Sequence, residues 1–232
     1  MTGMPELVAL FNGFGGAASA LVALSETWKY IEDTTLTLPT GLTLQVVVVA
    51  AGLSALVGWM TLTGSILAMF KLKGGVEIFG KWFSTPTWGP AWLNPVKVLL
   101  TVSVLALIVM SIDDPTNTDY LWAIIGISCL LGIVLVLPIG GADMPVVVSL
   151  LNSLSGIAAA FTGFIISNPV LIVAGSLVGA SGLILTFIMC KAMNRTLPDV
   201  LFKSFGGSTK EKVTRTTVSY THLRAHETLL DL

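Results

Sequence analysis

Long uncharged runs of apolar residues dominate the pattern of this chain. Residues 42–70 and 144–190 contain no charged side chain. A helix needs about 20 apolar residues to cross the hydrocarbon core of a bilayer, so the second run is long enough for two helices, with a break near Ser167-Asn168-Pro169. The whole pattern predicts six membrane-spanning helices, at residues 5–27, 43–70, 95–112, 120–138, 145–166 and 169–191.

The composition agrees with this pattern. Of the 232 residues, 54% are hydrophobic and 11% are charged, and the mean hydropathy is +0.88. These values exclude an ordinary soluble domain. The strands of a membrane β-barrel alternate apolar and polar positions, whereas the runs in this chain are continuous. The predicted fold class is therefore an all-α integral membrane protein, a bundle of about six transmembrane helices.

Basic residues gather on one side of the predicted helices. They lie between the second and third helices, just inside the third helix and after the sixth, at Lys71, Lys73, Lys81, Lys97, Lys191, Arg195, Lys203, Lys210 and Lys212. The connections on the opposite side hold a single base, Lys29, and three aspartates. Loops rich in Lys and Arg stay in the cytoplasm, so both termini are predicted to be cytoplasmic. The net charge of −1 gives no reason to expect a nucleic-acid partner.

One pattern occurs twice, 140 residues apart. Met4-Pro5 is followed by Asn12, and Met144-Pro145 is followed by Asn152 at the same spacing. In both places Pro stands where a helix begins and Asn lies two turns further in. The first and fifth helices would cross the bilayer in the same direction, which makes this a parallel pseudo-repeat. An amide at membrane depth is costly unless it is paired or hydrated, so each Asn is a candidate functional residue.

Small and polar residues share one face on three of the predicted helices. The faces are Asn12, Gly15, Gly16 and Ser19; Ser149, Asn152, Ser153 and Gly156; and Gly175, Ser176, Gly179, Ala180, Ser181 and Gly182. Small residues at this spacing let helices approach closely, and the polar ones could equally line a path for water or ions. The residues alone leave both interpretations open.

The residues around Asn152 belong to a longer motif. Gly140-Gly141-Ala142-Asp143 with Met144 to Ser149, and then Leu151-Asn152-Ser153, resembles the membrane domain of the β subunit of proton-translocating NAD(P) transhydrogenase. Other matching segments are Met4 to Ala9, Leu171 to Gly175, Val178-Gly179, Ser181-Gly182 and Ile188 to Arg195. The similarity covers residues 4–207 and is densest from 139 to 195.

This resemblance implies part of an enzyme that transfers hydride between NADH and NADP while protons cross the membrane. It implies that the chain itself binds no cofactor and holds no hydride-transfer residue. NADP(H) would be bound by a C-terminal domain of Rossmann type, and NAD(H) by the α subunit. It also implies a bacterial cytoplasmic (inner) membrane and a dimer of αβ units.

The resemblance also assigns roles to individual residues. Asn152 matches an asparagine in the proton path, Asp143 an acidic residue at its cytoplasmic mouth, and Arg195 an arginine where the last helix meets the NADP-binding domain. Asn12, Ser149 and Glu6 complete the predicted proton path. A small-residue face, thought to relay proton binding to the nucleotide site, matches Gly175, Gly179, Ser181 and Gly182.

Two features depart from the family pattern. No dinucleotide-binding fingerprint is found, so we expect the NADP-binding domain to be missing from this chain. The expected division is a membrane domain at 1–195, a cytoplasmic linker at 196–217 to the missing domain, and a sequence artefact at 218–232, which holds both histidines.

The second departure is at Asn12, where some family members carry a proton-binding histidine. An amide does not titrate near neutral pH, whereas imidazole does. We therefore expect an α-subunit helix to supply an ionisable residue within the membrane.

Other functions and roles fit some of the same residues. A small-solute or ion transporter with parallel repeats would explain the paired asparagines, and a scaffold could use the polar faces only to bind partner helices. Asp143 and Glu6 could serve only as carboxylates favoured by a helix N-terminus, and Arg195 could be a cytoplasmic anchor.

Overall fold

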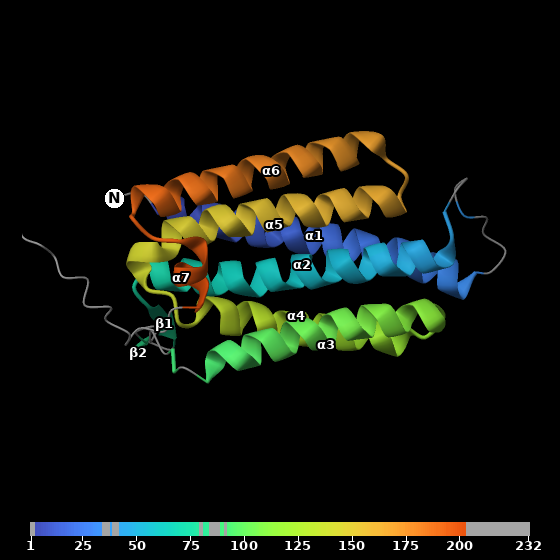
Figure 1. Ribbon diagram of the computed structural model, residues 1–232, viewed down its shortest axis with the longest axis horizontal. Helices are drawn as coiled ribbons and strands as arrows, with labels where there is room; N and C mark the ends of the chain where they lie inside the picture. The colour runs from blue at the N-terminus through green and yellow to red at the C-terminus, as the bar shows by residue number, and fades with distance from the viewer. Residues whose placement is uncertain are drawn as a thin grey trace, which may run out of the picture.

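The computed structural model describes residues 3–33, 38, 42–78, 81–83, 89–90 and 92–202. Six long helices run along a common direction in a bundle (Figure 1): α1 Met4–Glu32, α2 Leu44–Leu72, α3 Leu93–Asp113, α4 Thr118–Val136, α5 Met144–Ile165 and α6 Pro169–Ala192. Each is long and apolar enough to cross a membrane. The predicted fold class and all six predicted spans are confirmed, and the chain is a multi-pass membrane protein.

Several short elements were not predicted. Two strands, β1 (Val76–Ile78) and β2 (Lys81–Phe83), form an antiparallel hairpin, and a 3₁₀ turn, η1 (Gly141–Asp143), leads into α5. A short helix, α7 (Leu197–Phe202), follows α6. All of them lie at the end of the bundle where α1 begins (Figure 1), which we call the Met4 end.

Local signals explain the helix boundaries. Pro5 and Pro145 lie in the first turns of α1 and α5, where a proline has no helical hydrogen bond to lose. The break between α5 and α6 occurs at Ser167, whose φ of 52° is left-handed. The side chain of Asn168 then caps α6 by accepting hydrogen bonds from the backbone N–H groups of Val170 and Leu171, at 3.1 and 3.2 Å. The predicted break is confirmed.

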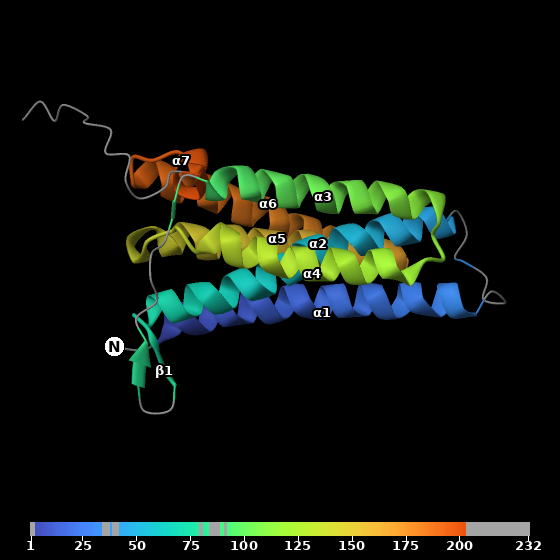
Figure 2. The same cartoon turned by 90° about the horizontal axis from the view of Figure 1, so that it is seen from below.

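Helices α2 and α5 form the centre of the bundle. Helix α1 packs along both of them, α4 packs on α2, and α3 lies outside α4 and α2 (Figure 2). Helix α6 packs chiefly on α5. Helices α1 and α5 both begin at the Met4 end and run in the same direction, as the parallel pseudo-repeat requires.

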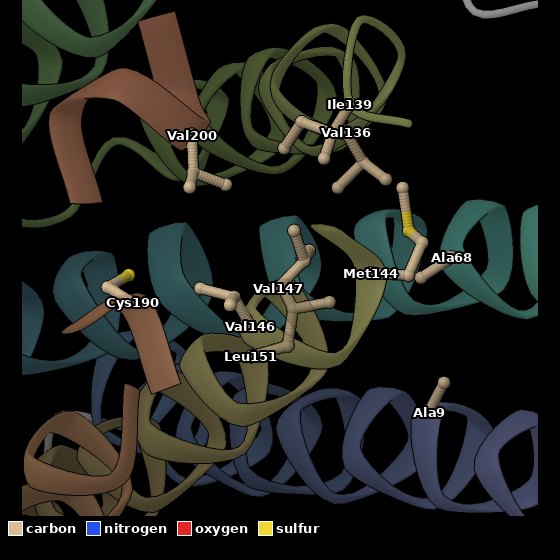
Figure 3. Packing of buried hydrophobic residues seen from close by; sticks show 10 residues of the cluster. All are labelled: Ala9, Ala68, Val136, Ile139, Met144, Val146, Val147, Leu151, Cys190 and Val200. Atoms are coloured by element: carbon tan, nitrogen blue, oxygen red, sulfur yellow. The ribbon is translucent and has the colours of Figure 1, made fainter. Parts of the chain in front are cut away.

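A buried apolar cluster fixes the Met4 end, where the predicted site residues Glu6, Asp143 and Arg195 lie. It joins α1, α2, the end of α4, α5, α6 and α7 (Figure 3): Ala9, Ala68, Val136, Ile139, Met144, Val146, Val147, Leu151, Cys190 and Val200. Because α7 contributes Val200, the chain beyond α6 folds back onto this cluster.

Candidate functional site

Asn12, on α1, contacts the neighbouring helix α5, which both the packing and the polar-path interpretations allow. Its Nδ2 donates a hydrogen bond to the backbone carbonyl of Val148 at 3.2 Å, and the side chain is partly buried. In an α-helix the carbonyl of residue 148 also accepts from the N–H of residue 152, so Asn12 contacts α5 one turn before Asn152. The two predicted asparagines therefore lie close in depth but do not bond to each other.

Asn152, on α5, is a predicted site residue whose side chain has no hydrogen-bond partner among the described residues. The residue is partly buried. Its helical position lies between the α5 face that contacts α1, marked by Val148, and the face that contacts α6, marked by Ser149 and Ser153. An amide with free donors and an acceptor at this position can bind water or a side chain from outside the described bundle.

The predicted small-residue face of α6 forms the interface with α5. A methyl group added at Gly175 would lie 2.6 Å from the backbone nitrogen of Ala160, and one added at Gly156 would lie 2.7 Å from the nitrogen of Gly179. Gly182 is similarly close to Ser153, at 2.9 Å from its Cα. These glycines let the two backbones touch.

Hydroxyl groups hydrogen-bond across this α5–α6 interface. Ser153 Oγ donates to the carbonyl of Gly179 at 2.6 Å, and Ser149 Oγ to that of Gly182 at 3.3 Å. Thr186 Oγ1, which was not predicted, lies 3.1 Å from Ser149 Oγ. Its spacing from Gly179 and Gly182, at i+7 and i+4, is the sequence signal that could have identified it.

Ser181 does not belong to the face on which it was predicted. It is exposed, and its hydroxyl donates to the carbonyl of Val178 on its own helix at 3.1 Å. One residue of helical rotation, about 100°, separates it from Gly182. The small-residue face that contacts α5 therefore consists of Gly175, Gly179 and Gly182.

Asp143 and Arg195 were predicted separately, and the structure joins them. Arg195 Nη1 donates to Asp143 Oδ2 at 2.8 Å. The Asp143 side chain is 6% exposed and that of Arg195 is 47% exposed. The pair connects the start of α5 to the residues that follow α6, at the Met4 end.

Glu6 lies in the first turn of α1 and is partly exposed. It forms no ion pair with any described residue. Its position favours a helix N-terminal carboxylate, and no contact links it to Asn12 or Asp143.

Two lysines that carried the charge-orientation argument are buried, which the sequence did not reveal. Lys71 is 8% exposed, and its Nζ donates to the carbonyls of Val136 and Ile139 at 3.0 and 2.8 Å and also to that of Leu137. It thereby satisfies carbonyls at the C-terminal end of α4, where a positive charge is favourable.

Lys97 is the second such lysine. It is 2% exposed, and its Nζ donates to the carbonyl of Leu201 in α7 at 2.5 Å. A lysine near a helix end is equally consistent with an exposed cytoplasmic residue, and no local pattern indicates a partner more than 100 residues away.

Toward the opposite end of the bundle, three helices meet in a hydroxyl cluster that was also missed. Ser54 Oγ lies 3.0 Å from Thr162 Oγ1, which donates to the carbonyl of Ser19 at 2.9 Å. The cluster joins α2, α5 and α1. Closer to the Met4 end, the buried hydroxyl of Ser65 on α2 has no hydrogen-bond partner among the described residues.

The described part of the six helices carries amides and hydroxyls in its interior and ionisable side chains near its ends. Every Asp, Glu, Lys and Arg in the six helices lies near a helix end, and no described residue is a histidine. A dinucleotide site needs a glycine-rich turn between a parallel strand and a helix. Within the described ranges the strands form an antiparallel hairpin, so these residues do not fit a nicotinamide dinucleotide.

Comparisons with known proteins show the family of the chain. The model of the NAD(P) transhydrogenase beta subunit family matches residues 1–231. The NAD(P) transhydrogenase subunit beta of Rhodospirillum rubrum is 40% identical over 209 residues, which is 89% of this chain and 42% of the relative. The sequence from a designated strain of that species gives the same values. The chain thus spans about two fifths of the length of these relatives, and it belongs to the NAD(P) transhydrogenase beta subunit family.

Proposed function

We propose that this chain is the proton-conducting membrane domain of an NAD(P) transhydrogenase, in which proton passage drives hydride transfer from NADH to NADP. One observation carries the proposal: predicted polar residues meet along α5. Asn12 contacts it at Val148, Ser149 faces α6, and Asp143 begins it with an ion pair to Arg195.

Amides and hydroxyls in such a path position water and do not hold the proton. The Asn12 and Asn152 amides do not titrate near neutral pH. They can order waters between α1 and α5, and Asp143 supplies an ionisable group at the Met4 end. In this proposal Asp143 exchanges protons with the solvent and Arg195 responds to its charge.

The glycine interface gives α6 freedom to move against α5. Coupling requires an element with two arrangements, one favoured by the proton and the other by the bound nucleotide. Helix α6 is held by backbone contact at Gly175 and Gly179 and by hydroxyl bonds that can exchange partners. Its C-terminal end leads directly to Arg195, so a shift of α6 would change the Asp143–Arg195 pair.

The site is incomplete without a titrating group within the membrane. We propose that a helix of the α subunit packs against α1 and α5, over the unpaired amide of Asn152, and contributes an ionisable residue at that depth. An α subunit without any such residue would contradict this part of the proposal.

The rest of the enzyme follows from the same proposal. NADP(H) is bound by a domain beyond residue 217, NAD(H) by the α subunit, and two αβ units form the complete enzyme. The Met4 end and both termini face the cytoplasm of a bacterium, with the bundle in the inner membrane. Residues 196–217 form the linker to the nucleotide domain. Residues 218–232 are a foreign segment. The transporter alternative is not favoured, because the family match extends over residues 1–231.

The proposal is tested in liposomes that contain the complete enzyme with this membrane domain. Asn152→Leu, a change of similar size that removes the amide, should abolish proton uptake during hydride transfer. The matched control is Ser176→Leu, because Ser176 is exposed and bonds only to the carbonyl of Ile172 on its own helix. Proton uptake measured with an internal pH dye should be normal in the control. Normal uptake with Asn152→Leu would contradict the proposal.

A further inference from the structure

The segment that leaves the membrane domain is attached at two points. Its first residues, after α6, carry Arg195, which bonds to Asp143 at the start of α5. Its last described residues, Leu201 and Phe202, are bound by α3. Helix α7 follows the first attachment and carries the second at its C-terminal end, beside the start of α3 (Figure 2).

The second attachment consists of four residues, which we call the α3–α7 clamp: Asn94, Lys97, Leu201 and Phe202. Lys97 Nζ donates to the carbonyl of Leu201 at 2.5 Å and lies 5.6 Å from the centre of the Phe202 ring. Asn94 Nδ2 donates to the carbonyl of Phe202 at 2.7 Å. Both carbonyls belong to the C-terminal end of α7, which lacks helical partners for them.

Burial makes this attachment strong. Lys97 is 2% exposed, and a buried ammonium is tolerated only where hydrogen bonds or opposite charge compensate for the lost water. No described carboxylate forms an ion pair with it. The carbonyl of Leu201, the negative end of the short helix and the Phe202 ring provide the compensation. Releasing α7 would remove these compensating contacts from the ammonium.

Helix α7 is also fixed on its other sides. Thr196 Oγ1 accepts a hydrogen bond from the backbone N–H of Asp199 at 3.3 Å and begins the helix. Val200 is 5% exposed in the apolar cluster that contains Met144 and Cys190 (Figure 3). The segment from Arg195 to Phe202 is therefore a rigid connection between α5 and α3.

We propose that the α3–α7 clamp is a positioning device for energy coupling. It rests on the proposed function, in which the chain beyond Phe202 leads to the NADP-binding domain. If the segment from Arg195 to Phe202 were flexible, a movement at the Asp143–Arg195 pair would not displace the chain that follows it. With α7 held on α3, the movement passes to the nucleotide domain. Lys97 is the central positioning residue, and its ammonium bonds to α7 and to none of the predicted proton-path residues.

The test uses Lys97→Met in the complete enzyme, because methionine keeps the length and burial of the side chain and removes its donor. Hydrogen–deuterium exchange should show faster exchange of the amides of residues 199–202, with α5 and α6 unchanged. In liposomes, hydride transfer should persist, while the number of protons translocated per hydride should fall.

Three further variants make the result specific. Lys97→Arg keeps a donor and a charge and should restore most of the coupling. Asn94→Ala removes the bond to Phe202 from a partly exposed site, so it tests the clamp even if Lys97→Met does not fold. It should cause a smaller loss of the same kind. Lys73→Met, an exposed lysine at the same end of the bundle, should leave the ratio unchanged.

The outcomes separate this inference from the function on which it rests. Faster exchange in α7 with a normal proton-to-hydride ratio would overturn the coupling role, and unchanged exchange would overturn the clamp itself. An unmodified enzyme that transfers hydride without moving protons would overturn the proposed function and this inference with it.

Discussion

Asp143 and Arg195 form an ion pair whose two members are buried to very different extents. The Asp143 side chain is 6% exposed, whereas the guanidinium of Arg195 reaches solvent from a side chain that is 47% exposed. Removing one partner strands the other, and a stranded charge costs more where water cannot reach it. The pair should therefore respond unequally to the loss of each member.

We predict that Arg195→Gln destabilises the protein more than Asp143→Asn. Leaving the buried carboxylate unpaired should cost about 3 kcal/mol, and leaving the half-exposed arginine unpaired about 1 kcal/mol. The double variant should be about as stable as Asp143→Asn alone, because it contains no stranded carboxylate. Thermal unfolding in detergent, followed by circular dichroism, measures all three.

The exposed Glu26–Lys29 pair in α1, at 2.6 Å, provides the control. Lys29→Gln should cost about 0.5 kcal/mol or less. Equal costs for the two single changes at Asp143 and Arg195, or a double variant that shows their sum, would contradict the unequal-burial account.

Individual site residues could be predicted where they belong to a sequence motif. They could not be predicted where their role depends on a contact with a distant part of the chain. Asp143 and Arg195 were found by resemblance, but their bond follows only from the fold. Lys71 and Lys97 were noticed as charges, yet their burial depends on carbonyls of α4 and α7. Ser181 shows the opposite error, because adjacency to Gly182 in sequence does not mean a shared helical face.

At the α5–α6 interface, glycines, which have no side chain, determine how closely α6 packs on α5. At Gly175 an added methyl group would lie 2.6 Å from the backbone nitrogen of Ala160 and 2.7 Å from the carbonyl oxygen of Gly156. Neither backbone atom can rotate away as a side chain would. Helix α6 has few contacts other than α5, so its position depends on this interface.

We predict that Gly175→Ala forces α6 away from α5 and lowers the melting temperature. Overpacking of this kind typically costs about 1–3 kcal/mol. Gly126→Ala on α4 is the matched control, because nothing lies within 4 Å of the added methyl group. There alanine should be neutral or stabilising, since it favours the helix more than glycine does. Similar melting temperatures for the two variants would contradict the close-contact interpretation.

The six long helices were predictable because length and apolarity alone determine a membrane span. The ends of these helices were harder to predict. Helix α1 continues to Glu32, past the predicted residue 27, because the Glu26–Lys29 pair and a bond from Trp28 to Glu32 stabilise its last turns. Helix α7 is short and falls in a segment predicted as a linker. Its stability comes from Val200 and the α3–α7 clamp, which no local pattern reveals.

In the whole molecule, one end of the bundle gathers the elements that the proposed coupling uses. The Met4 end holds the start of α5, the residues after α6, the Lys71 contacts to α4 and the α3–α7 clamp (Figure 1). The amide of Asn12 lies further along the bundle, two turns into α1. This layout connects a polar path to the segment that leaves the membrane.

The central claim is that protons crossing this domain drive hydride transfer, and an imposed proton gradient tests it most directly. The rate of hydride transfer from NADH to NADP is measured in liposomes containing the complete enzyme, with and without a pH difference across the membrane. We predict that the gradient accelerates NADPH formation by the unmodified enzyme and by Ser176→Leu, and has no effect on Asn152→Leu. A rate that does not change with the gradient in the unmodified enzyme, or a rate that the gradient accelerates in Asn152→Leu, would contradict the account.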